Sequence, residues 1–298
     1  MFRIEGLMNW MVEMKTAILT DSAAIIAPQI KHKLAIKTLS LPLLLNGKRY
    51  YEKYDYDRQQ VKAMLREKNS FLMCGQVSVT AIDEFLNELI DKGYTDVIWV
   101  YLDNDISGLG NNLRSYQQRH DQINIHLVDS YSMGVAEGNL AVLAAKLVAQ
   151  GKDWNAIEPI LKEVRNSNRT VMILKNLRHI STTGYVKNGV FPIQKTIFRP
   201  QTLMRFNPQG QLEVQSAYLQ HSKLSQTIRR MIMPAYQEMA GQLQITITAI
   251  RTRHNDQVIS RLIKAINRTF PAAQIKLYEM NLSMIAHIGT DGIVISWG

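Results

Sequence analysis

A glycine-bearing turn between an apolar run and a polar helix has the residue types of an anion site. Residues 97–102 (VIWVYL) form an apolar run that predicts a strand buried on both faces, and residues 111–120 predict a helix. Ser107 and Gly110 lie in the turn, and Asn111 begins the helix. Backbone N–H groups at a helix start attract an anion at the carboxyl end of a parallel sheet. The local sequence alone favours a plain connection that only shapes the turn and caps the helix.

Cys74 and His287 are the other residues whose side chains could take part in a reaction or bind a ligand. A cysteine is a nucleophile only when a base lies near it, and it is more often a small apolar filler. We expect His287 in a glycine-flanked turn over 286–292, where it could hydrogen-bond an anion or nearby backbone. The sequence has no P-loop, G-x-S-x-G elbow, dinucleotide fingerprint or Cys/His metal spacing. No catalytic residue, cofactor or metal is therefore predicted.

In the first half of the chain, alternating strand and helix patterns must position Cys74 and the turn that contains Ser107. Strands are predicted at 15–20 and 123–128, with helices at 57–68, 78–91, 138–150 and 154–164. A further helix is expected to start directly at Asp21-Ser22 and to stop near Pro28. Such alternation predicts a parallel sheet with helices on both faces. The polar strand ends at Asp21, Ser107, Asp129 and Ser130 should then meet at one edge.

The second half of the chain has a different order of elements. Strands are predicted at 170–174, 243–250, 275–278 and 293–296, with a hairpin around 208–210. Helices are predicted at 222–241, kinked or broken by Pro234, and at 256–270. This pattern indicates a second α/β unit with an antiparallel portion. The expected organisation is an extension over 1–14, a parallel-sheet α/β domain over 15–166 and a mixed-sheet α/β domain over 167–298.

Composition limits the classes of protein that remain. The 298 residues are 46% hydrophobic and 20% charged, without an apolar run that could span a bilayer. One cysteine allows no internal disulfide, which fits a reducing cytoplasm. The net charge of +10 comes from dispersed basic residues without an aromatic-interleaved patch. A solvated basic surface is preferred over a nucleic-acid partner, with weak affinity for anionic lipid left open.

Several strand-end motifs occur together in one order. They are 18–22 (ILTDS), the Gln76 loop, 107–109 (SGL), 128–130 (VDS) with Ser132 and Gly134, and Ala286-His287 with Gly289 and Gly292. In this combination the chain resembles the DegV family of bacterial fatty-acid-binding proteins, from about residue 15 to its end. An early hairpin motif, residues 46–50 (NGKRY) with Asp55, matches as well.

The resemblance implies a two-domain α/β fold with one long-chain fatty acid, or a related acyl lipid, buried between the domains. It implies a non-catalytic carrier that presents the fatty acid to a separate fatty-acid kinase. Its ligand-binding positions fall on Asp21, Ser22, Cys74, Gly75, Gln76, Ser107, Gly110, Asn111, Ser130, His287, Gly289 and Thr290.

Two of these motifs depart from the family pattern. Residues 74–78 read CGQVS where the family has Thr-Ser-Gln-Pro-Ser, and 107–112 read SGLGNN where it has Ser-Gly-Leu-Ser-Gly-Thr. Hydroxyl groups are thus lost at Cys74, Gly75 and Gly110. Backbone N–H groups at Gly75, Gly110 and Asn111 are expected to replace them, and a different head group is equally compatible. Two alternatives follow: an acyl hydrolase or transferase using Cys74 or His287, and a charge-driven binder of nucleic acid or anionic membrane.

Overall fold

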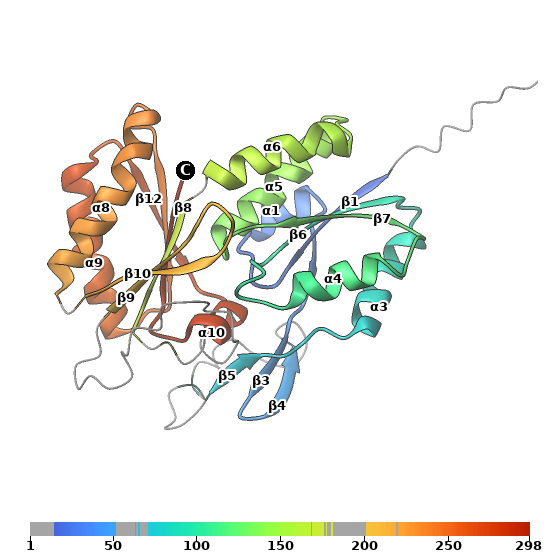
Figure 1. The fold of residues 1–298 in the computed structure, drawn as a ribbon, viewed down its shortest axis with the longest axis horizontal. Coiled ribbons are helices and arrows are strands. Elements are labelled where there is room, and N and C mark those ends of the chain that lie inside the picture. The colour runs from blue at the N-terminus through green and yellow to red at the C-terminus, as the bar shows by residue number, and fades with distance from the viewer. Residues whose placement is uncertain are drawn as a thin grey trace, which may run out of the picture.

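The computed structural model describes residues 15–51, 63, 65, 71–167, 169–175, 177, 180, 201–218 and 220–298. The extension over 1–14 and nearly all of the charged helix predicted at 57–68 lie outside these residues. The described part contains three sheets, with helices packed on them: a parallel sheet, a mixed sheet and a small antiparallel sheet (Figure 1). The predicted combination of a parallel-sheet N-terminal part and a mixed-sheet C-terminal part is confirmed. The boundary near residue 166 stays a prediction.

The N-terminal sheet has the strand order β2-β1-β6-β7, with all pairs parallel. Its strands are β1 (Thr16–Asp21), β2 (Lys37–Leu39), β6 (Asp96–Tyr101) and β7 (Asn124–Asp129). The helices are α1 (Pro28–Lys33), α3 (Val79–Ile90), α4 (Leu109–Gln117), α5 (Val135–Ala149) and α6 (Trp154–Ser167).

Alternate strand residues separate two cores on the two faces of this sheet. Leu19 and Trp99 pack in the cluster that holds α3 and α4, whereas Ile18 and Ile98 pack with α5 and α6. Every residue of β6 is buried, as its apolar run predicted. The helix expected directly after Asp21 is wrong, because α1 begins only at Pro28. Proline suits the first turn of a helix, where its missing N–H costs nothing.

The mixed sheet has the order β10-β9-β8-β13-β11-β12, and only β11 and β12 are parallel. Its strands are β8 (Arg169–Leu174), β9 (Gln201–Phe206), β10 (Leu212–Tyr218), β11 (Gln244–Ala249), β12 (Gln274–Glu279) and β13 (Ile293–Trp297). Helices α8 (His221–Glu238) and α9 (Arg253–Thr269) pack on one face. Pro234 lies inside α8 without ending it.

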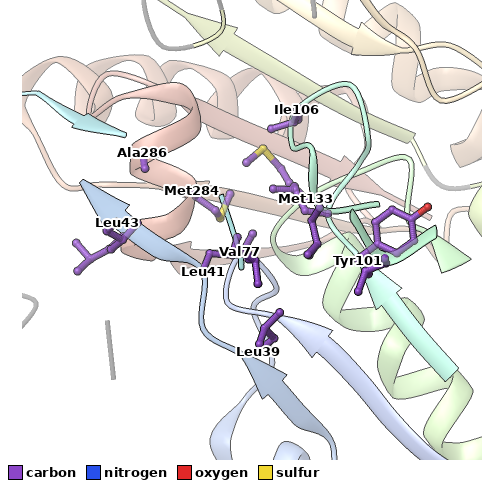
Figure 2. Close-up of a cluster of buried hydrophobic side chains, with 14 of the residues drawn as sticks. Leu39, Leu41, Leu43, Val77, Tyr101, Ile106, Met133, Met284 and Ala286 are labelled. Atoms are coloured by element: carbon purple, nitrogen blue, oxygen red, sulfur yellow. The ribbon is translucent and has the colours of Figure 1, made fainter. Parts of the chain in front are cut away.

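The other face of the mixed sheet shares a core with the N-terminal sheet. Met172 and Met204 of this face belong to the same apolar cluster as Leu19 and Trp99. Helix α10 (Leu282–Ile288) lies within this shared cluster, which we call the central cluster, and packs against the small sheet (Figures 1 and 2). The small sheet is antiparallel and comprises β3 (Pro42–Leu45), β4 (Lys48–Tyr51) and β5 (Leu72–Cys74).

The predicted Asn46-Gly47 turn joins β3 to β4. Both residues have positive φ, 52° and 84°, which is the geometry of the hairpin turn that Asn-Gly favours. The sequence at 33–45 predicts a strand that Pro42 interrupts, with an edge or a new segment beyond it. The structure agrees, because β2 ends at Leu39 and Pro42 begins β3.

Candidate functional site

A cavity of about 260 Å³ opens where the small sheet, the start of α4 and the end of α10 meet. Its polar lining combines the loop after β5, the turn before α4 and a histidine of α10. Apolar side chains complete it. The lining residues are Leu41, Met73, Cys74, Gly75, Gln76, Val77, Ile106, Ser107, Gly108, Leu109, Asn112, Ala286 and His287. Figure 2 shows Leu41, Val77, Ile106 and Ala286 among the buried side chains of the central cluster.

Five of the twelve predicted ligand positions line this cavity: Cys74, Gly75, Gln76, Ser107 and His287. Segments far apart in the sequence are thus brought together by the fold. The Gly75 N–H, which was expected to bind a carboxylate, is already occupied because it donates to the carbonyl of Pro42 at 2.7 Å.

The start of α4 supplies the helix N-terminus that the sequence predicted. The Ser107 hydroxyl accepts from the Leu109 N–H at 3.3 Å, and Ser107, Gly108 and Leu109 line the cavity. Within the described residues, no hydrogen bond engages the N–H groups of Gly110 and Asn111. The positive end of the helix dipole therefore lies at the cavity.

Gly110 and Asn111 themselves lie outside the cavity lining. Gly110 is buried so closely against Tyr101 that an added Cβ would come within 2.4 Å of the ring. Asn111 is exposed, and its side-chain oxygen accepts from Arg114 Nη2 at 2.7 Å.

The polar side chains at the carboxyl ends of β1 and β7 form hydrogen bonds within the protein. The buried carboxylate of Asp21 accepts from the N–H groups of Ala23 and Leu102, each at 2.8 Å, which joins the end of β1 to the end of β6. Burial raises the pKa of Asp21 to about 6. Ser130 is buried, and its hydroxyl donates to the carbonyl of Ser132 at 3.0 Å.

A second, larger groove lies at the cap residue of α10. Ser22 lines that groove of about 470 Å³ together with Thr20 and Asn281, whereas His287 lines the cavity. The helix is fixed by its cap residue. Asn281 accepts from the Met284 N–H at 2.8 Å and donates to the Ala23 carbonyl at 3.1 Å.

His287 lies in this helix, so the predicted turn around it is wrong. The Asn281 cap starts a helix that runs to Ile288, and Gly289, with φ 76°, ends it. His287 is only 4% exposed. Gly289 and Thr290 follow the helix outside the cavity lining, and the Thr290 carbonyl accepts from Asn255 at 3.0 Å.

Cys74 shares the cavity with His287, and its thiol contacts the carbonyl of Ser283 at 3.8 Å. The half-buried cysteine is therefore oriented towards the backbone of α10. The arrangement offers a histidine, a hydroxyl and a helix N-terminus to an anionic group.

Apart from Ala286, which belongs to a motif noted in the sequence, the apolar part of the lining was not identified beforehand. No periodicity at Leu41, Met73 or Ile106 separates a cavity wall from a packed core. For Asn112 the sequence does give an indication, because this residue lies in the first turn of the predicted helix. Its amide donates to the Val77 carbonyl at 3.4 Å and links α4 to the loop after β5.

The described residues offer neither a helical membrane span nor a metal centre. Their helices are too short or too polar to extend across a bilayer. The described residues also contain no group of three or more His, Cys, Asp or Glu side chains placed to hold a metal ion.

Comparison with known families gives one match over most of the chain. Residues 15–297 match the model described as "Uncharacterised protein, DegV family". The DegV domain-containing protein YqaC of Lactococcus lactis is 23% identical over 285 residues, which cover 94% of this chain and 97% of that protein. A DegV domain-containing protein of Streptococcus pyogenes is 22% identical over 251 residues, covering 84% and 88%.

Solved structures with the same fold include three described by their lipid ligands. The fatty acid binding DegV family protein of Streptococcus agalactiae has a TM-score of 0.83 at 20% identity, covering 95% of this chain and 98% of that one. DegV of Bacillus subtilis, a fatty acid binding protein, has a TM-score of 0.76 at 19% identity, covering 95% and 99%. A DegV family protein of Eubacterium eligens, loaded with heptadecanoic acid, has 0.73 at 16% identity, covering 94% and 98%.

Proposed function

The chain belongs to the DegV family, and from this premise we propose that it binds one long-chain fatty acid, or a related acyl lipid, with the head group beside His287. The observation that carries the proposal is the cavity itself. It joins the predicted loop at 74–77, the start of α4 and His287 in one lining, and the central cluster lies behind it.

The head group is held by His287, the Ser107 hydroxyl and the N-terminus of α4. These groups suit a carboxylate, because an imidazole N–H or hydroxyl donates to it and a helix start favours negative charge. They replace the hydroxyl groups that this chain lacks at Cys74, Gly75 and Gly110.

The acyl tail enters the central cluster. A cavity of about 260 Å³ is smaller than the range of about 300–1,000 Å³ usual for ligand pockets, so a long chain needs further room. Met133 and Met284 lie in the cluster next to the cavity wall (Figure 2), and both are fully buried. Methionine has three flexible bonds and adapts to irregular spaces. Each buried CH₂ of the tail contributes about 0.8 kcal/mol.

The protein acts as a carrier without catalytic residues of its own and presents the fatty acid to a separate kinase. The resemblance supports this role, as does the absence of an enzyme motif from the sequence. A hydrolase based on Cys74 is not favoured, because the thiol is directed at the Ser283 carbonyl. Alkylation of Cys74 should leave any ester-hydrolysis rate unchanged.

The test is mass spectrometry of organic extracts from the purified protein, paired with titration of a fluorescent fatty acid. We expect an acyl chain at near one per protein and saturable binding. Met284→Ala should shift the retained chains towards greater length, while the volume-conserving Met284→Leu should not. No co-purifying acyl chain together with no saturable binding would falsify the proposal.

A further inference from the structure

A further, partly open space of about 230 Å³ lies where the end of α6 and the loop after β7 meet the mixed sheet. It shares no lining residue with the cavity beside His287. The lining residues are Tyr131, Arg165, Asn166, Arg169, Thr170, Val171, Arg205, Phe206, Asn207, Pro208, Met231 and Trp297. We call this space the arginine cavity.

The lining of the arginine cavity is strongly basic. It includes three arginines, Arg165, Arg169 and Arg205, and none of its described lining residues is acidic. Two acidic residues of the described part contact these arginines: the Glu213 carboxylate lies 3.6 Å from Arg205 Nη2, and the backbone carbonyl of Asp129 accepts from Arg165 Nη1 at 3.2 Å. Arg169 donates to the Asn166 carbonyl. Among the described lining residues there are thus three guanidinium groups and no carboxylate.

Trp297 brings its indole ring to the lining and is only 3% exposed. Its Nε1 and the Nε of Arg165 each have less than 1 Å² of accessible surface. Recognition of a ligand in this space therefore depends on the outer guanidinium nitrogens of the three arginines.

The sheet register places the basic groups on one side. Arg169 of β8 is opposite Trp297 of β13, and Val171, two residues on, is opposite Arg205 of β9. Residues two apart in a strand face the same way. Arg169, Arg205 and Trp297 therefore share one face of the sheet.

Arg165, near the end of α6, lines the same space and is held in place. Its guanidinium carbon lies 4.0 Å from the centroid of the Tyr131 ring. The ring also packs against Gly210 of the β9–β10 turn, where an added Cβ would come within 2.2 Å of it. Tyr131 adopts a φ of 48°, a conformation rare for a residue other than glycine. The surrounding contacts thus fix the ring on which Arg165 rests.

We propose that the arginine cavity binds a phosphate dianion, either inorganic phosphate or the phosphate group of a small monoester. Planar guanidinium groups bind phosphate oxygens in pairs, and several arginines around one space favour a dianion over a carboxylate. Because Trp297 lies in the same lining, its indole ring can report on a bound ligand. This site is independent of the proposed lipid function.

The experiment uses the full chain labelled with ¹⁵N, with the Trp297 indole resonance assigned through Trp297→Phe. Inorganic phosphate, phenyl phosphate and acetate are titrated separately at constant ionic strength. We expect a saturable shift of the Trp297 indole signal with phosphate and no saturable shift of the Trp99 indole. Arg169→Gln and Arg205→Gln should each raise the phosphate Kd by about tenfold or more, while the exposed Arg268→Gln should leave it unchanged.

Binding of phenyl phosphate as tightly as phosphate would identify a monoester site, and binding of phosphate alone a site for the free ion. Either outcome supports the proposal. It is overturned if phosphate produces no saturable shift in the folded protein, or if acetate binds with the same affinity. An equal loss of affinity in Arg268→Gln would also overturn it, because that result indicates general charge screening.

Discussion

The hydroxyl oxygens of Ser22 and Ser283 lie 2.7 Å apart and join the end of β1 to α10 across 261 positions of the chain. The Ser22 hydroxyl also accepts from the N–H of Leu41 at 2.9 Å. One side chain therefore connects the parallel sheet, the segment that enters the small sheet and the helix that carries His287. The position of His287 beside the cavity depends on this connection.

Ser22→Ala should lower the free energy of unfolding by about 1–2 kcal/mol, because the Leu41 N–H loses its acceptor. Ser283→Ala should cost less, and the double variant should cost less than the sum of the two. Urea denaturation measures all three, with the exposed Ser222→Ala as control. Strict additivity would show that the two hydroxyls are not coupled.

Gly110→Ala should destabilise the protein by roughly 1–3 kcal/mol, because the new methyl group overpacks the space below Tyr101. Alanine is otherwise the better helix residue by about 1 kcal/mol, so the sign of the change is informative. Gly75→Ala is the matched control, since its Cβ would meet its nearest neighbour at an ordinary 3.5 Å. Thermal unfolding compares the two. A stabilised Gly110→Ala would contradict the close packing seen here.

His287→Ala should weaken retention of a fluorescent fatty acid by about tenfold, because a donor to the carboxylate is lost. The matched control is His120→Ala, whose imidazole stacks on Tyr116 and is not part of the cavity lining. Binding and melting temperature are measured on the same samples. A sharp fall in melting temperature with unchanged lipid content would show that His287 is only structural.

Stability should fall as pH rises from 5 to 8, and Asp103→Asn should reduce that fall. Burial, aided by the nearby Asp129 carboxylate, raises the pKa of Asp103 from 3.8 to about 9. Between these values the unfolded chain has lost the proton that the folded protein keeps, so rising pH favours unfolding. The slope for one such group is at most about 1.4 kcal/mol per pH unit.

Denaturant titrations at several pH values measure this difference. Burial also raises the pKa values of Asp21, Asp129 and Glu137. These three groups therefore also lower the stability as pH rises, both in the wild type and in Asp103→Asn. Asp103→Asn keeps an oxygen for the Asp105 N–H, to which Asp103 Oδ1 is bonded at 2.8 Å. The exposed Asp121→Asn is the control. Identical pH profiles for the wild type and Asp103→Asn would exclude Asp103 as the source.

Local patterns in the sequence were sufficient for most elements of the fold. The apolar run at 97–102 identified the central strand β6, Ser78 identified the start of α3 through its hydrogen bond to the Ala81 N–H, and Asn46-Gly47 identified a hairpin. These features depend on neighbouring residues, so propensity and periodicity determine them. The order of the strand-end motifs also identified the family.

Contacts between distant residues decided the rest. A helix forms around His287 because the Asn281 side chain caps it and contacts Ala23, a partner that local sequence does not reveal. Gly110 is small because Tyr101 lies over it. The meeting of Arg165 with Trp297 depends on strand register and on packing between the two sheets. The sequence alone determined which segments form strands and helices, whereas the side chains that share a cavity follow only from how those segments pack.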